Sequence, residues 1–513
     1  MPNDAGPVGA GARAGTEPSA TAHAGGQADT AGRSLVLAAC LMATFMAAVE
    51  SSIVATAIPT LVGDLGGFNL FSWVFTIYLL TQAVSIPVYG RLADLYGRKR
   101  VFFVGTGLFL AGSTLCGLAW NMIALIAFRA LQGFGAGGIM PITSTILGDI
   151  YMPTERARVQ GMVSSVFGVS AVVGPSLGAF LIEHWSWSVV FWVNIPIGAA
   201  SIGMLALFFR EHVKVRQHRI DWLGSLLLLV AASLLLIALV QGGSLGRGVL
   251  AGASAAGVAM LVVLYLHERS TSEPMLPLEL WRSRVIVIGS LGNGTSGALM
   301  MGVSAFLPTY VQGAMGRSPL AGGLVLGAMS VSWALASIVS ARIMARTSYR
   351  LTAVWGGVAL ATGSAMLLLL RPVDGPGWAA VASFIMGIGM GFCSTTFIVS
   401  VQASVPWRQR GAATSSTMFL RFVGQSAGAA GCGAVLNASI LHLDPAAVAQ
   451  VDRLLEPASR AALAPGVVAH LTEVMSWSLR NAYGLAFGFA LLTLLVASRL
   501  PPRLNPAQQV LRR

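Results

Sequence analysis

The chain has 513 residues, of which 55% are hydrophobic and only 10% are charged, and its mean hydropathy is +0.75. A soluble domain carries about 25% charged residues, so this composition excludes an ordinary cytosolic enzyme, a disulfide-rich secreted domain and a disordered protein. The formal charge of +13 comes from 32 basic and 19 acidic residues. The basic residues fall in short breaks between apolar runs, which argues against nucleic-acid binding.

Residues 1–33 are rich in Gly, Ala, Thr and Pro, and we expect them to form a disordered tail. Fourteen apolar runs of spanning length follow. Each is expected to form a transmembrane helix, because a helix satisfies its own backbone hydrogen bonds in lipid. The runs begin near Leu35, Leu70, Val101, Met122, Gln160, Ser188, Trp222, Val249, Val285, Leu320, Leu351, Trp378, Ala412 and Asn481.

The distribution of Lys and Arg predicts the topology. If the chain starts in the cytoplasm, most of its basic residues lie in the inner segments, as the positive-inside rule requires. We therefore expect a multi-pass cell-membrane protein, with a bacterial inner membrane favoured and both termini cytoplasmic. The predicted units are a six-helix bundle at 34–210, linkers and two inserted helices at 211–284, a second six-helix bundle at 285–500 with a long outer loop at 437–480, and a tail at 501–513.

Glu50 is the one acidic residue that lies deep in an apolar run. A charge in the membrane interior costs about 3 kcal/mol, so Glu50 is a functional candidate. Burial disfavours an ionised carboxylate, which would let Glu50 load and release a proton, and the same group could attract a cationic substrate. A structural Glu bonded to a neighbouring helix is the alternative. Arg129 is the expected counter-charge, and Arg421 is a second cation within a run. Snorkelling towards the surface is an alternative for both arginines.

The segment between the second and third runs is a candidate gate. Gly90 and Gly97 permit a tight turn, and Asp94 can cap a helix N-terminus. Arg98 can pair with Asp149 at the inner end of the fourth run. These contacts are expected to latch the two bundles together on the cytoplasmic side in one state.

The fifth run contains a second candidate gating motif, with Gly174, Pro175 and Gly178. Small residues permit close helix packing, and proline kinks a helix. The string also matches a GxSxG nucleophile motif, but no strand-turn-helix context or His partner accompanies it. A GxxxxGK[ST] phosphate loop is missing from the sequence, and the four cysteines form no CxxC pair. We therefore expect no enzyme activity, no cofactor and no metal site.

Aromatic and amide side chains on the inner helices are candidates for a substrate cavity, although ordinary packing is the alternative for each. Besides Glu50, the candidates are Trp73, Tyr78, Gln82, Asn293, Phe397, Phe419 and Gln425, with Trp333 as a further member of the group.

These features together resemble the major facilitator superfamily, and specifically its fourteen-span drug:proton antiporter branch. In chain order, the matching residues are Glu50 to Pro59 in the first run, Gly90, Asp94, Gly97, Arg98 and Lys99 in the loop, Arg129 to Gly135 in the fourth run, and Gly174, Pro175 and Gly178 in the fifth. Two positions depart from the family pattern: Glu50 stands where Asp is usual, and Ala179 where a second Gly is usual.

The resemblance implies an all-α major facilitator fold with two six-helix bundles plus two inserted helices. It also implies alternating access driven by inward proton flow, and hence a proton-coupled multidrug efflux antiporter. One carboxylate cannot balance two positive charges and also release protons, so lipophilic monovalent-cationic or neutral compounds are favoured. An exporter of lipids or of one metabolite, a proton-coupled importer, and a receptor or scaffold remain alternatives.

The expected partners follow from this function. They are membrane lipid, a small-molecule substrate and protons, without nucleic acid. A periplasmic adaptor could dock on the outer loop, and the functional unit is expected to be a monomer.

Overall fold

The computed structural model describes residues 30–151, 153–211, 221–240, 246–271, 280–405, 410–455 and 457–502. Helices are the only regular elements in these ranges. The expectation of an all-α protein is therefore confirmed.

The first half of the chain forms one helix bundle, which we call the N-terminal half. Its helices are α1 (Thr30–Leu65), α2 (Phe71–Tyr96), α3 (Arg98–Gly117), α4 (Met122–Ile150), α5 (Pro153–His184), and the consecutive pair α6 (Trp187–Trp192) and α7 (Asn194–Phe208). A short 3₁₀ turn, η1 (Phe68–Leu70), precedes α2.

Two further helices follow, and then a second bundle that we call the C-terminal half. The inserted helices are α8 (Trp222–Val240) and α9 (Arg247–Ser270). The C-terminal half comprises α10 (Arg284–Ser304) with its extensions α11 (Leu307–Thr309) and η3 (Tyr310–Ala314), α12 (Pro319–Arg346), α13 (Tyr349–Leu368), α14 (Gly375–Ser404), α15 (Arg410–Leu443) and α18 (Pro465–Ser498). The remaining short elements are η2 (Leu280–Arg282), η4 (Pro372–Asp374), η6 (Ala447–Ala449), α16 (Val451–Leu455) and α17 (Pro457–Ala462).

Twelve helices within the described residues are long and apolar enough to cross a membrane. The 32-residue α5 and the 19-residue α8 run beside them. With α6 and α7 taken as one interrupted segment, this arrangement agrees with the fourteen runs expected from the sequence. One boundary differs: α15 extends to Leu443 and α18 begins at Pro465. The connection is therefore shorter than the predicted outer loop at 437–480.

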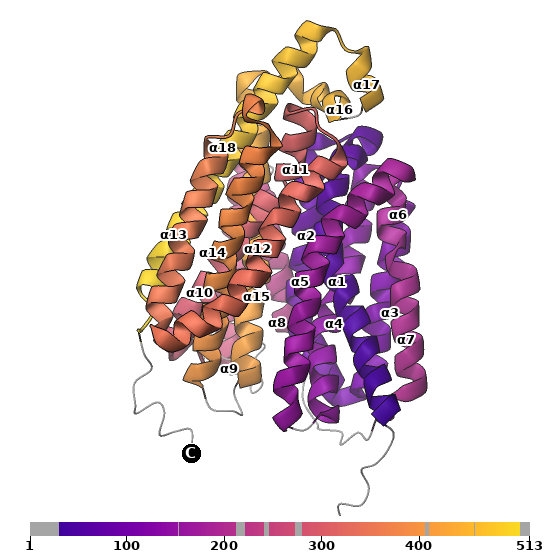
Figure 1. Ribbon diagram of the computed structural model, residues 1–513, viewed down its shortest axis with the longest axis vertical. Helices are drawn as coiled ribbons and strands as arrows, with labels where there is room; N and C mark the ends of the chain where they lie inside the picture. Colours follow the sequence, from indigo (N-terminus) through magenta and orange to yellow (C-terminus); the bar gives the residue numbers. More distant parts are fainter. Residues whose placement is uncertain are drawn as a thin grey trace, which may run out of the picture.

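The two ends of the bundle are different. Figure 1 shows α16 and α17 at one end, which we call the capped end, and the start of α1 and the end of α18 at the other. We call this second end the basic end, because Arg98, Lys99 and Arg100 lie there. In Figure 1, α5 and α12 lie side by side near the capped end and separate towards the basic end.

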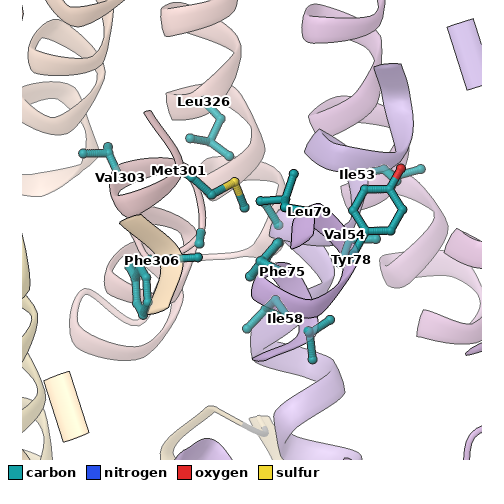
Figure 2. Packing of buried hydrophobic residues seen from close by; sticks show 14 of the residues in the cluster. Ile53, Val54, Ile58, Phe75, Tyr78, Leu79, Met301, Val303, Phe306 and Leu326 are labelled. Atoms are coloured by element: carbon teal, nitrogen blue, oxygen red, sulfur yellow. The ribbon is translucent and has the colours of Figure 1, made fainter. Parts of the chain in front are cut away.

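The two halves meet along a buried apolar seam. Helix α12 packs against α5, and α15 packs against α2. Figure 2 shows Phe75 and Leu79 of α2 next to Met301 of α10, within one cluster that contains residues of both halves. The inserted helix α8 packs on α2 and α15 at one side of this seam.

Candidate functional site

Glu50 lies inside the N-terminal half, with 0% of its surface exposed. Its Oε1 forms an ion pair with Arg129 Nη1 of α4. Its Oε2 accepts a hydrogen bond of 2.6 Å from Asn194 Nδ2, at the start of α7. Both carboxylate oxygens are therefore bonded, and three helices converge on one buried acid.

The Arg129 guanidinium is held on several sides. Its Nη1 also donates to Gln132 Oε1 at 2.7 Å, and its Nε donates to the Val74 carbonyl at 3.1 Å. Its Cζ lies 4.0 Å from the centre of the Tyr78 ring, a cation–π contact. Arg129 Nη2 has no hydrogen-bond partner within the described protein. The guanidinium is fully buried in the core and does not snorkel to the surface.

Polar side chains of α3 and α7 complete the network around Glu50. Ser113 Oγ accepts from Gln132 Nε2 at 2.7 Å and from Asn194 Nδ2 at 3.1 Å. Further hydrogen bonds to the charged groups offset part of the cost of burying an ion pair. Gln132 and Asn194 bond the pair directly, and Ser113 bonds both of them. Gln132 belongs to the motif of the fourth run, but none of the three was expected from the sequence as a partner of Glu50. Asn194 directly follows an aromatic stretch of α6, and only the fold brings it to Glu50.

Small residues allow the helices to come this close. A Cβ at Gly133 would meet the Tyr78 backbone, and a Cβ at Gly135 would meet the Phe109 backbone. The glycines of α4 therefore set its approach to α2 and α3, and this approach brings Arg129 beside Tyr78.

The candidate gating motif of the fifth run packs on α1 next to Glu50. A Cβ at Gly178 would lie 3.0 Å from the Ile53 carbonyl of α1. In the C-terminal half, a Cβ at Gly323 of α12 would lie 2.7 Å from the Pro175 carbonyl of α5. Gly174 also faces α1, through Ser52. This part of α5 therefore touches both the helix that carries Glu50 and the opposite half.

The predicted substrate residues do not form one group. All seven besides Glu50 are buried. Trp73 and Phe419 share an apolar cluster with α8, whereas the Tyr78 ring lies under Arg129. Phe397 packs on Gly292 inside the C-terminal half. Gln82 lies on α2, and its backbone carbonyl lies against Gly137 of α4.

The two predicted amides of the C-terminal half have separate partners. Asn293 Nδ2 donates to the Gly289 carbonyl at 3.2 Å, and its Oδ1 has no partner in the described protein. Gln425 Nε2 lies 3.9 Å from Met300 Sδ.

The loop between α2 and α3 differs from the predicted latch. Arg98 Nε lies 3.3 Å from Asp149 Oδ2, as the sequence suggested, but both residues belong to the N-terminal half. Glu211, rather than Asp94, provides the carboxylate at the start of α3. It accepts hydrogen bonds from the backbone amides of Arg98 and Lys99 at 2.5 and 3.1 Å. These contacts join α3 to α4 and to the segment after α7, rather than one half to the other.

Asp94 and Gly90 also differ from their expected roles at this loop. Asp94 lies in the last turn of α2, not at a helix start, and its side chain is outside the described residues. Gly90 lies within α2, and only Gly97, with φ 88°, forms the turn.

Comparison with known proteins decides the family. Residues 40–429 match the model of the Major Facilitator Superfamily. The chain belongs to this superfamily. The membership agrees with the helical architecture and confirms the prediction of a membrane transporter rather than an enzyme.

Curated relatives and solved structures of major facilitator proteins agree with this assignment. The chain is 33% identical to Multidrug resistance protein 3 of Bacillus subtilis over 78% of this chain and 79% of that protein. It is 32% identical to Multidrug transporter protein MdtP of the same organism, over 79% and 76% of the two chains. A bacterial homologue of the human lysosomal transporter Spinster has the same fold, with a TM-score of 0.62 and 18% identity over 92% of this chain and 99% of that chain.

The transporter is closed at its capped end. Asp452 of α16 accepts from the Gly67 and Phe68 amides of the N-terminal half at 3.1 and 3.2 Å. Asn437 Nδ2 of α15 donates to the Asn69 carbonyl at 2.7 Å. Deeper in the seam, Ser426 Oγ donates to the Thr76 carbonyl at 2.9 Å. Among the described residues, the hydrogen bonds between the halves all lie in the part of the seam nearer this end.

Asp452→Ala is expected to open the capped end, whereas Asp452→Asn should keep it closed. Alanine leaves two amides unpaired, which shifts the closed-to-open ratio by about tenfold or more, and asparagine still offers an acceptor. Burial raises the pKa of the Asp452 carboxyl despite the two amide bonds. Since the closed form then binds a proton more readily than an exposed carboxyl does, lowering the pH stabilises closure.

A Ser72→Cys reporter measures this opening, because Ser72 is buried in the seam and all four native cysteines are buried. A membrane-impermeant maleimide should label it faster in the Asp452→Ala background only. Equal labelling in all three backgrounds would mean that Asp452 does not hold the closure.

Gly97→Ala is expected to destabilise the protein by about 1–2 kcal/mol, because a side chain at this positive φ is strained. Its Cβ would also lie 2.8 Å from Glu211 Oε2. Gly90→Ala is the matched control, since a Cβ there meets nothing within 4 Å and alanine favours a helix. Thermal unfolding in detergent compares the two variants. A lower melting temperature for Gly90→Ala than for Gly97→Ala would contradict the assignment of the turn to Gly97.

Proposed function

We propose that this protein is a proton-coupled multidrug efflux antiporter that exports lipophilic compounds by alternating access. One observation carries the proposal: the only described acid deep within the spans, Glu50, is fully buried and paired with Arg129. A proton on Glu50 removes its negative charge and leaves Arg129 without a counter-ion. Protonation therefore changes the electrostatics at the point where α1, α4 and α7 meet.

The position of Glu50 couples this change to the seam between the halves. Glu50 lies on α1, and α1 packs on α5 through Gly178. Helix α5 in turn contacts α12 through Pro175 and Gly323. A shift of α1 on proton binding is thus transmitted to the contact about which the halves rock. The relatives named as a multidrug resistance protein and a multidrug transporter support the direction and breadth of transport.

The orientation belongs to the same proposal. We place the basic end in the cytoplasm, because cytoplasmic loops are enriched in Lys and Arg. The structure is then closed on the outer side and accepts substrate from the inner side. The proposed location is the cell membrane of a bacterium.

The preference for cations expected from the sequence loses its physical basis here. It depended on Glu50 as a free negative charge, whereas Glu50 has 0% exposed surface and is bonded to both Arg129 and Asn194. The residues of the seam are apolar, so they still favour lipophilic substrates.

The test uses inside-out membrane vesicles and a panel of fluorescent dyes that includes anionic, neutral and cationic members. Acidifying the vesicle interior should drive uptake of several dyes, and a protonophore should stop it. Uptake that is unchanged by the protonophore would exclude proton coupling, and movement of dye in the opposite direction would indicate an importer.

A further inference from the structure

Arg421 is a cation within the span α15 that the proton site does not use. It lies about 17 Å along the axis from the first residue of α15, at 1.5 Å per residue. Its Cζ is 5.2 Å from the centre of the Trp333 ring of α12. Its Nη2 lies 4.0 Å from Met300 Sδ of α10. The side chain is half-buried, so it keeps some accessible surface.

The direction of this side chain excludes snorkelling to the nearer, basic end. The Arg421 backbone faces Gly297 of α10, where a Cβ would meet the Arg421 carbonyl. Met300 lies three residues beyond Gly297, which is about 4.5 Å closer to the capped end. Because the guanidinium reaches Met300, the side chain extends away from the basic end. Its charge therefore stays inside the bundle.

No carboxylate of the described residues pairs with this guanidinium. The guanidinium contacts the thioether of Met300 and the face of Trp333, and the Gln425 amide contacts the same sulfur atom. An unpaired charge inside a membrane protein is costly and marks a ligand or ion path by default. Arg129, by contrast, has the Glu50 carboxylate as its counter-charge within its own half.

Arg421 also lies beside the seam. Helix α15 packs against α2, and α12 packs against α5, so the two helices that the Arg421 side chain joins both face the N-terminal half. Trp333 itself packs on the apolar cluster that contains residues of both halves, so a solute that enters between the halves would meet its ring and the guanidinium beside it.

From this arrangement we propose that Arg421, Trp333, Met300 and Gln425 form a binding site for a planar aromatic compound that carries an anionic group. The guanidinium binds the anion, and the amide of Gln425 donates a further hydrogen bond to it. The indole of Trp333 stacks on the ring, while the flexible thioether of Met300 adapts to its shape. The site rests on the proposed efflux function for its physiological meaning and selects anionic over cationic lipophilic substrates.

Three naphthalene compounds of similar size test the site by equilibrium binding to the purified full-length protein: naphthalenesulfonate, uncharged naphthalenemethanol and naphthylmethyl-trimethylammonium. The wild type should bind the sulfonate about tenfold or more tightly than the ammonium compound. Arg421→Gln should weaken the binding of naphthalenesulfonate about tenfold and change the binding of naphthalenemethanol by less than about threefold. Arg421→Lys should restore most of the sulfonate affinity.

Arg342→Gln is the matched control, since Arg342 is an exposed arginine of α12. Equal losses for the sulfonate and the alcohol in Arg421→Gln would show a purely structural role and overturn the site. Tighter binding of the ammonium compound than of the sulfonate by the wild type would overturn it too. Binding requires no proton gradient, so failure of this test leaves proton-driven efflux of other dyes intact, and loss of proton coupling leaves this binding intact.

Discussion

Glu50→Gln is expected to reduce pH-gradient-driven efflux to the level of vesicles without the protein, while exchange of labelled for unlabelled dye at equal pH continues. Glutamine has nearly the same shape and keeps one oxygen that can accept the hydrogen bond from Arg129, but it cannot release a proton. The halves can therefore still rock with substrate, and only the coupling to protons is lost. Dye flux with and without an imposed gradient measures both rates.

Glu473→Gln is the matched control for this prediction. Glu473 is an exposed glutamate of α18, so its substitution should leave both rates unchanged. Gradient-driven efflux by Glu50→Gln at the wild-type rate would show that the proton is carried elsewhere.

Arg129→Gln is expected to destabilise the protein by about 3–5 kcal/mol, because it leaves the Glu50 carboxylate buried without a cation. The folded protein can avoid this cost by keeping Glu50 protonated. The destabilisation should therefore be larger at pH 8 than at pH 5, and gradient-driven efflux should be lost because the proton is not released. Thermal unfolding at the two pH values measures the effect.

The double variant Glu50→Gln with Arg129→Gln separates the ion pair from general packing. It removes both charges, so it should be more stable than Arg129→Gln alone at pH 8. Asp149→Asn, at the half-exposed pair with Arg98, should cost no more than about 1 kcal/mol. A double variant less stable than Arg129→Gln at pH 8 would contradict the assignment of that cost to an uncompensated charge.

The fold could be predicted from the sequence because the membrane imposes one rule on every segment. An apolar run long enough to span must be a helix, and the alternation of basic loops orders the runs. The end of α15 at Leu443 and the start of α18 at Pro465 were less predictable. The first turns of α18 are polar because they extend beyond the apolar core of the bundle, and hydropathy does not detect such extensions.

The site could be predicted only in part. Glu50 and Arg129 stand out because each is a charge in an apolar run. Asn194, Ser113 and Gln132 are ordinary polar residues on separate helices, and their convergence on Glu50 depends on how α3, α4 and α7 pack. Glu211 replaces Asp94 as the acid at the start of α3 for the same reason, since it lies 113 residues beyond Arg98, from whose amide it accepts a hydrogen bond.

The two central charges lie in different halves, and this separation suits an antiporter. In the proposed mechanism Glu50 carries the proton in the N-terminal half, while Arg421 lies in the C-terminal half on α15, which packs against α2 at the seam. Moving one charge across 100 mV is worth about 2.3 kcal/mol. With a membrane potential that is negative inside, inward protons and outward anions would both be driven in the favourable direction.

The most direct test of the proton-coupling account follows protons and solute together in reconstituted vesicles. A dye without titratable groups is loaded on one side at equal pH, and a pH indicator reports proton movement as the dye flows down its gradient. The account predicts that protons move against the dye in a fixed ratio with the wild type and do not move with Glu50→Gln. Dye flow through the wild type without proton movement, or the same ratio with Glu50→Gln, would contradict it.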